Sequence, residues 1–253
     1  MCLIAFAWQV ADQPLLLLGN RDEFHARPTR NAQFWEPEGH PELLAGKDLE
    51  AGGTWLGITR QGRFASLTNI RAPGARKGPL SRGALVLDYL TGQQSPAEYL
   101  QQVAMNAEQY AGFNLLVGDR QQLWHLNSRS GQAESLSPGI YALSNAGLNS
   151  PWPKLVALRQ GLEARLHADD RQLLQLLADP RTYPDEQLPD TGISLEWERL
   201  LSAAFIVSAE YGTRASSLLR LKANGEVVFI EQRFGPEGVA LGEQRWCFAC
   251  KDQ

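Results

Sequence analysis

The residue best suited to covalent chemistry is the second one of the chain. Cys2 is a small residue directly behind Met1, so we expect Met1 to be removed, which would leave a thiol and a free α-amine on one residue. A thiol with a pKa of about 8.5 beside an amine with a pKa of about 8 can exchange its proton near neutral pH. Cys2 is therefore predicted to be a nucleophile that carries its own base, and the alternative is a small apolar residue that begins a buried strand.

A charged tetrapeptide, Asn20-Arg21-Asp22-Glu23, follows a run of leucines without an intervening loop. If this apolar strand forms a hairpin with the strand that begins at Cys2, the charged side chains lie near the thiol. An arginine would then lower the pKa of the thiol, and a carboxylate would position the α-ammonium group. The alternative is an exposed turn held by ion pairs, which is common where strands end.

Other polar side chains follow apolar runs and are candidates for binding the substrate. Asn69, Asn114 and Asn145 carry neutral amides, which suit the stabilisation of a developing oxyanion in acyl transfer. Each of them could equally be a turn residue. Arg214 stands near the start of a late strand. It is predicted either to bind a substrate carboxylate or to be a charged residue at the edge of a sheet.

No metal site is predicted. Cys247 and Cys250 form a C-x-x-C pair, but a structural zinc needs four ligands and the sequence has no second pair. The four histidines also lack the spacing of metal ligands.

Short apolar runs bounded by Gly, Pro, Asp or Ser predict the strands, and a spacing of three and four between apolar residues predicts the helices. A loop with Pro and Gly is expected before residue 54, and another around Pro180, Pro184 and Pro189. The predicted strands are 2–8, 15–19, 55–59, 63–69, a meander of four within 113–145, 203–209, 216–234 turning at Asn224-Gly225, and 243–250. The predicted helices are 82–91, a capped one from Ser95, 152–167 and 169–179.

Strands arrive in blocks with helices between the blocks, which does not fit a parallel βαβ sheet. The order predicts an α+β fold: a four-layer αββα sandwich of two antiparallel sheets flanked by helices. The whole chain, residues 1–253, is expected to form one domain.

The composition is 43% hydrophobic and 21% charged with a net charge of −4, which offers no basic footprint for nucleic acid or an anionic membrane. No apolar run is long enough to span a bilayer, and no signal peptide is evident. We therefore expect a cytoplasmic protein with reduced cysteines that acts on a small molecule. The oligomeric state stays open.

Several motifs resemble the NRDE family, which includes the transport and Golgi organisation 2 proteins. They are, in order, an N-terminal MC, NRDE, HARPT, GGTWLGI, ASLTN, GFNLLVGD, YALSNA with PWPK, and YGTRAS. The resemblance implies the fold of N-terminal-nucleophile (Ntn) hydrolases, and activity on carbon–nitrogen amide bonds of the cysteine acylase type. It requires no cofactor.

The resemblance also implies roles for single residues. Cys2 would be nucleophile and base, Arg21 and Asp22 its supporting pair, Asn69 and Asn145 oxyanion donors, and Arg214 a structural or substrate-binding residue.

The remaining ligand contacts are assigned to Asn20, Glu23, Trp55 and Asn114. In the acylases the supporting Arg and Asp are separated by two residues, whereas here they are adjacent and would point to opposite faces of a strand. Either Glu23 or a local bend fills the second role, or the site does not work as an amidase.

The resemblance implies an alternative, because eukaryotic members are associated with haem trafficking and with lipid or acyl-CoA homeostasis. The protein would then bind a hydrophobic ligand without catalysis. Trp35, Trp55 and Phe113 are candidate apolar walls, and Cys2 or a histidine a candidate axial ligand for haem.

Overall fold

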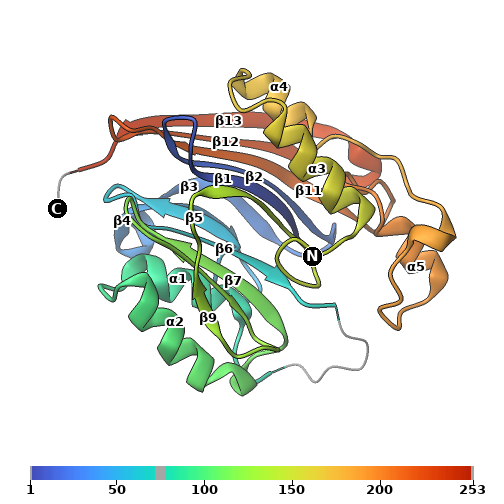
Figure 1. Ribbon diagram of the computed structural model, residues 1–253, viewed down its shortest axis with the longest axis horizontal. Helices are drawn as coiled ribbons and strands as arrows, with labels where there is room; N and C mark the ends of the chain where they lie inside the picture. The colour runs from blue at the N-terminus through green and yellow to red at the C-terminus, as the bar shows by residue number, and fades with distance from the viewer. Residues whose placement is uncertain (1, 72–77, 252–253) are drawn as a thin grey trace.

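The computed structural model describes residues 2–71 and 78–251, which form two antiparallel sheets with helices on their outer faces (Figure 1). The first sheet has the strand order β10-β1-β2-β11-β12-β13 and the second the order β3-β4-β5-β6-β7-β8-β9. The strands of the first sheet are β1 (Cys2–Val10), β2 (Gln13–Phe24), β10 (Gly139–Leu143), β11 (Tyr211–Leu221), β12 (Glu226–Phe234) and β13 (Ala240–Ala249). Those of the second are β3 (Thr29–Trp35), β4 (His40–Asp48), β5 (Leu56–Thr59), β6 (Phe64–Asn69), β7 (Phe113–Gly118), β8 (Leu123–Asn127) and β9 (Ala133–Ser135).

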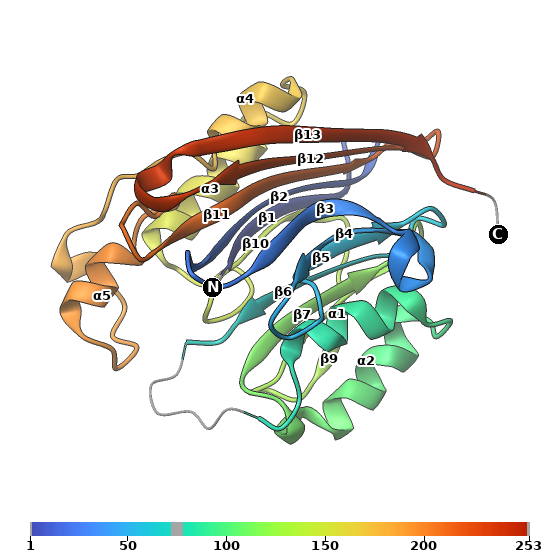
Figure 2. The same cartoon turned by 180° about the vertical axis from the view of Figure 1, so that it is seen from behind.

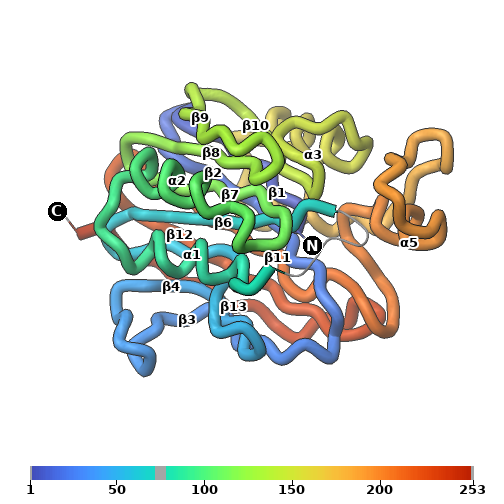
Figure 3. Tube along the Cα trace, turned by 90° about the horizontal axis from the view of Figure 1, so that it is seen from below, coloured from blue at the N-terminus to red at the C-terminus, as the bar shows by residue number. Residues whose placement is uncertain are grey.

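The helices form the outer layers. Helices α1 (Arg82–Thr91) and α2 (Pro96–Met105) lie over the second sheet, as Figure 3 shows from that side. Helices α3 (Pro153–Glu163) and α4 (Asp170–Gln175) cover the first sheet, and α5 (Leu195–Leu200) lies beyond its end (Figure 2). The predicted αββα sandwich is confirmed.

Alternation along the strands explains the three apolar layers, because successive side chains of a strand point to opposite faces. In β2, Leu15 and Leu17 pack between the two sheets, while Leu16 and Leu18 pack against α3 and α4. A third cluster, around Phe113 of β7, lies under α1 and α2. The leucine run before the charged tetrapeptide is thus buried on both faces, as its composition indicates.

Most predicted elements are present, including the hairpin of β1 and β2, the turn at Gly62 and the capped start of α2. Ser95 accepts from the backbone N–H of Glu98, and the Glu98 carboxylate accepts from the backbone N–H of Ser95. Strand β2, however, extends to Phe24, so the charged tetrapeptide lies within the strand rather than behind it.

Three predictions were wrong. The expected loop before residue 54 contains β3 and β4, since Pro41 is tolerated near the first residue of its strand. The expected meander ends at β9, because β10 leaves the second sheet and pairs with β1 of the first. Residues 203–209 form no strand, although they are apolar, and the residues before them include helix α5.

Within the described residues, no helix is long and apolar enough to cross a membrane.

Candidate active site

A cavity of about 320 Å³ opens where β1 begins and β2 approaches its end, and Cys2 is part of its lining. The other functional side chains come from both sheets and from the first turn of α1. They are Arg21, Asp22 and Glu23 of β2, Arg27, Asp48 at the end of β4, Trp55, Asn69 at the end of β6, and Arg82 of α1. The fold therefore brings most of the predicted site residues together.

Cys2 and Arg21 are paired directly across β1 and β2, so their side chains lie on the same face of the sheet. This is the face toward the second sheet, where the Arg21 guanidinium lies 4.3 Å from the centre of the Trp55 ring. The Nη2 atom of Arg21 is 3.4 Å from Oδ2 of Asp48. Arg21 is 5% exposed, so a fixed and nearly buried cation lies beside the thiol.

Asp22 makes its contacts on the opposite face of β2, as alternation requires. Its Oδ1 accepts a hydrogen bond of 2.7 Å from the Thr213 hydroxyl, and its carbonyl oxygen accepts one of 3.1 Å from the Tyr211 hydroxyl. The register between β2 and β11 shifts between Thr213 and Ala215. Both Arg21 and Asp22 still reach the cavity lining, although they are adjacent in sequence.

The protonation of the site follows from its burial. Burial raises the pKa of the Cys2 thiol, and the Asp22 carboxylate acts in the same direction, whereas Arg21 opposes them. Burial also raises the pKa of Asp22, against the effect of the Lys154 charge and the Thr213 hydrogen bond. A thiol with a raised pKa is protonated at neutral pH, so nucleophilic attack by Cys2 needs a base.

Asn69 and Asn145 are in contact, but their side-chain amides have different hydrogen-bonding roles. The Nδ2 atom of Asn145 donates to the backbone oxygen of Asn69 at 2.8 Å, which fixes the end of β6. Asn69 lines the cavity, and its own amide makes no hydrogen bond within the described residues. Asn69 is thus the amide free to donate to a ligand, while Asn145 positions it.

Asn20, Asn114 and Arg214 lie outside the cavity lining. Asn20 and Asn114 were predicted as ligand contacts, whereas Arg214 was predicted as a structural or a substrate-binding residue. The Asn20 amide donates to the carbonyl oxygens of Leu177 and Ala204. Nη1 of Arg214 donates to two backbone carbonyls, at 2.8 and 3.0 Å.

Asn114 is fully occupied by hydrogen bonds. Its Nδ2 donates to Thr68 and Ser144, and its Oδ1 accepts from Asn127 at 2.8 Å. The side chains of Asn20, Asn114 and Arg214 thus fix backbone carbonyls around the cavity.

Arg82, Asp48 and Lys154 were not predicted from the sequence. Arg82 stands in the first turn of α1, where a cation opposes the helix dipole. This unfavourable placement of a cation is the feature of the sequence that could have indicated a functional role for Arg82. Although burial alone would raise the pKa of Asp48, the hydrogen bond of 2.6 Å from Arg27 holds it below its ordinary value. Lys154 is buried behind the sheet, and nothing in the local sequence indicates this.

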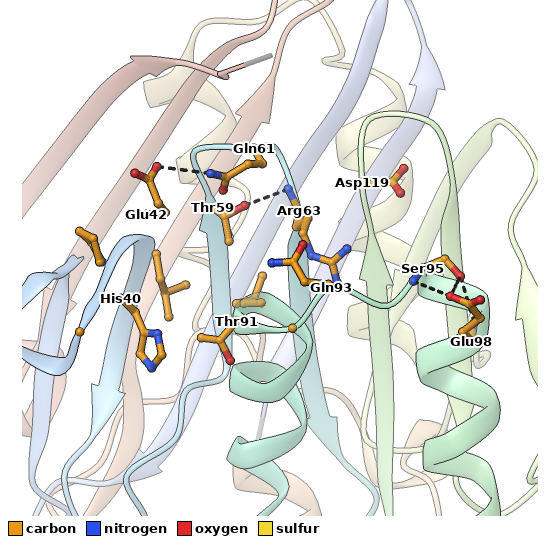
Figure 4. Close-up of a pocket in the computed structure, with 15 residues that line it drawn as sticks. His40, Glu42, Thr59, Gln61, Arg63, Thr91, Gln93, Ser95, Glu98 and Asp119 are labelled. Atoms are coloured by element: carbon orange, nitrogen blue, oxygen red, sulfur yellow. Dashed lines mark hydrogen bonds between the residues drawn. The ribbon is translucent and has the colours of Figure 1, made fainter. Parts of the chain in front are cut away.

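A larger hollow of about 760 Å³ lies away from Cys2, beside the turn between β5 and β6 and the end of α1 (Figure 4). Its side chains include Glu42, Arg63 and Glu98, and Figure 4 shows them spread around an open rim. Its described lining contains no cysteine, and the Ser95 hydroxyl, which donates to the Glu98 carboxylate at 2.8 Å, belongs to the capping box of α2. The cavity at Cys2 is therefore the candidate site.

Cys2, Cys247 and Cys250 are free thiols. The described residues contain no group of three or more His, Cys, Asp or Glu side chains placed to hold a metal ion.

Two antiparallel sheets packed between outer layers of helices form the αββα sandwich that the resemblance to Ntn hydrolases implies. The chain is similar in fold to the C2A mutant of conjugated bile acid hydrolase from Clostridium perfringens, with a TM-score of 0.54 and 9% identity, covering 98% of this chain and 92% of that one. At this identity the similarity concerns the fold alone.

Residues 1–236 match the family described as Transport and Golgi organisation 2. The Transport and Golgi organization protein 2 homolog of Bos taurus is 34% identical over 261 residues, covering 92% of each chain. The homolog of Homo sapiens is 33% identical over 273 residues, covering 97% of each chain. The chain therefore belongs to the Transport and Golgi organisation 2 family.

Proposed function

We propose that the protein is an N-terminal-cysteine hydrolase that cleaves the carbon–nitrogen amide bond of a small N-acyl substrate. The observation that carries the proposal is one cavity lined by Cys2, by the buried Arg21 that is paired with it across the strands, and by Asn69. The fold shared with conjugated bile acid hydrolase supports the same class of reaction.

In the first half of the proposed reaction, the Cys2 sulfur attacks the carbonyl carbon of the amide. The thiol proton passes to the α-amine of Cys2, which is free once Met1 has been removed. The oxyanion that forms accepts a hydrogen bond from the Asn69 amide. The carbon–nitrogen bond then breaks, and the departing amine takes the proton from the α-ammonium group, which leaves a thioester on Cys2.

In the second half, water attacks the thioester carbon. The α-amine accepts a proton from the water and returns it to the departing sulfur, so the carboxylic acid leaves and Cys2 is restored. Arg21 stabilises negative charge next to the sulfur in both halves, because it is paired with Cys2 across the strands. Asp22 holds the α-ammonium, and Thr213 orients its carboxylate.

The first prediction concerns Cys2→Ala. The full-length protein and this variant would be incubated with N-acyl anilides of short to long acyl chains, and release of the amine followed by absorbance. We expect the wild type to hydrolyse at least one of them and the variant to lose about a thousandfold or more in rate. Alanine is as small as cysteine, so removal of Met1 is not impaired.

Cys250→Ala is the matched control, since it removes a half-buried thiol far from Arg21. It should hydrolyse as the wild type does. Equal rates in Cys2→Ala and wild type, with both proteins folded by circular dichroism, would show that Cys2 is not the nucleophile.

Haem or acyl-CoA binding without catalysis stays a prediction. Polar and charged side chains dominate the lining of the cavity, whereas sites for hydrophobic ligands are mostly apolar. Of the predicted apolar walls, only Trp55 lies in the lining, and Trp35 and Phe113 are buried in the layer under α1 and α2. We therefore propose hydrolysis rather than ligand binding. We also propose that it takes place in the cytoplasm, where we expect the protein from its sequence.

A further inference from the structure

A second hollow, of about 200 Å³, lies on the other side of the Arg21 and Trp55 pair, which lines both spaces. We call it the arginine pocket. It lies where β3 of one sheet faces β11 and β12 of the other, and four guanidinium groups line it: Arg21, Arg30, Arg214 and Arg233. Such a concentration of one charge is unusual in a hollow between two sheets.

The strand register explains why there is room between the arginines. Arg21 is paired with Ala215, and Ala215 with Arg233, so these side chains form a row on one face of the sheet. Cys2 belongs to the same row, next to Arg21. Adjacent strands are about 4.8 Å apart, which places the two arginine strands about 10 Å apart. The methyl group of Ala215 leaves most of the space between them unfilled.

The charges around the pocket do not cancel. Glu231 is the one carboxylate among the described lining residues, and its Oε1 is occupied by the backbone N–H of Ala32 at 2.9 Å. Arg21 pairs with Asp48 at 3.4 Å and Arg30 with Glu38 at 2.5 Å, and both of these carboxylates lie outside the pocket lining. In contrast, Arg233 donates to the carbonyl of Leu241 and, like Arg214, forms no ion pair within the described part of the chain.

Three lining guanidiniums carry a buried N–H group that lacks a hydrogen-bond partner within the described residues. These groups are Nη1 of Arg21, Nε of Arg30 and Nε of Arg233. Arg21 is 5% exposed, so bulk water does not replace the missing partner. Buried donors of this kind are rare because an unmet hydrogen bond is unfavourable. Arg21 and Arg233 stand on either side of Ala215 in the row across the strands, so their donors lie at the two ends of one space.

We propose that the arginine pocket binds an oxyanion, the carboxylate or phosphate group of a small ligand, between Arg21 and Arg233 above Ala215. Guanidinium groups match the geometry of both anions. The inference goes beyond hydrolysis at Cys2 and does not depend on it. The pocket holds an anion whether or not Cys2 is catalytic, and the shared Arg21 places that anion next to the active site.

The test is isothermal titration calorimetry of the full-length protein with inorganic phosphate and, separately, with acetate, at constant ionic strength. Two variants remove the site in different ways. Arg233→Met removes one charge while keeping an apolar stem, and Ala215→Leu keeps every charge but fills the space. Arg245→Met is the matched control, because Arg245 is an exposed arginine of β13 paired with Asp170.

We expect the wild type to bind one of the two anions, and both pocket variants to bind it at least about tenfold more weakly, as for loss of a charge-assisted hydrogen bond. The control should stay within about twofold of wild type, since its charge is remote. Tighter binding of phosphate points to a phosphorylated ligand, and tighter binding of acetate to a carboxylate.

Two results would overturn the proposal: no heat of binding with either anion at millimolar concentration, or equal affinities in the wild type and in Arg233→Met. Circular dichroism checks folding, and if Ala215→Leu fails to fold, Arg233→Met decides alone. Because the titration uses free anions, loss of hydrolysis in Cys2→Ala leaves the outcome unaffected.

Discussion

Two adjacent charges of β2 have different neighbours because strand side chains alternate. Arg21 points between the sheets, onto Trp55 and beside Cys2, while Asp22 points to the helical side, where Thr213 holds it. Arg21 and Asp22 are adjacent here, whereas two residues separate them in the acylase pattern. Both nevertheless line the cavity. In the proposed mechanism Arg21 therefore acts on the Cys2 sulfur and Asp22 on the α-amine.

Behind Asp22 lies a buried lysine. Nζ of Lys154 donates to the carbonyl oxygens of Leu201 and Ala203, at 2.6 and 3.2 Å. Burial lowers the pKa of Lys154 to about 8, although the nearby Asp22 carboxylate acts against this shift. In the unfolded chain the same group titrates near pH 10.4, the ordinary value for lysine.

This difference predicts how stability depends on pH. Between about pH 8 and about pH 10 the unfolded chain binds one more proton at Lys154 than the folded chain, so the free energy of unfolding rises with pH. Urea denaturation of the wild type and of Lys154→Met at several pH values measures it. We expect the wild type to gain stability relative to the variant as pH rises through this range. A difference that does not change with pH contradicts the assignment.

Among the elements, the first turn of α1 is held against the loop before β5 by two glycines in close contact. A Cβ atom added at Gly53 would lie 2.4 Å from the backbone carbon of Gly83 and 2.5 Å from its oxygen. The backbone N–H of Thr54 donates to the same oxygen at 3.2 Å. Since Thr54, Gly83 and Arg82 all line the cavity at Cys2, this contact sets the position of one wall.

Gly53→Ala should therefore cost about 1–3 kcal/mol in the free energy of unfolding, as for other overpacked sites. Gly83→Ala is the comparison, because its Cβ would lie 3.3 Å from its nearest neighbour, the nitrogen of Thr54. Within a helix, alanine is more stable than glycine by about 0.5–1 kcal/mol, which offsets the cost of this tight contact. We therefore expect Gly83→Ala to leave the free energy of unfolding nearly unchanged. Urea denaturation of both variants measures this, and equal costs would mean that the contact does not restrict the loop.

A second segment, residues 203–209, shows why an apolar run was mistaken for a strand. Its backbone forms no ladder with a neighbouring strand: the carbonyl of Ala204 accepts from the Asn20 side chain and the N–H of Ile206 donates to the Thr213 hydroxyl, while the carbonyl of Ile206 accepts from the backbone N–H of Thr213. Such partners lie far away in sequence, so local composition cannot reveal them. The same hydroxyl then donates to Asp22, which connects this segment to the cavity at Cys2.

For the molecule as a whole, the sequence predicted the sandwich and the pairing of the charged tetrapeptide with the chain start. Both follow from local patterns: alternating strands, and a short hairpin from Cys2 to Phe24. The arrival of Asp48 and Arg82 at the same cavity was not predictable, because it depends on how the second sheet packs onto the first. Asn114 was misplaced for a related reason, since its partners Thr68, Ser144 and Asn127 come from three separate segments.

We propose that Cys2 acts with a free α-amine, and the intact mass of the purified full-length protein decides whether that amine is free. We expect Met1 to be absent from the bulk of the chains, so that Cys2 is the first residue. If most chains keep Met1, the α-amine of Cys2 is tied up in a peptide bond and the proposed proton transfer cannot occur. That result would contradict the hydrolase mechanism while leaving the arginine pocket to its own test.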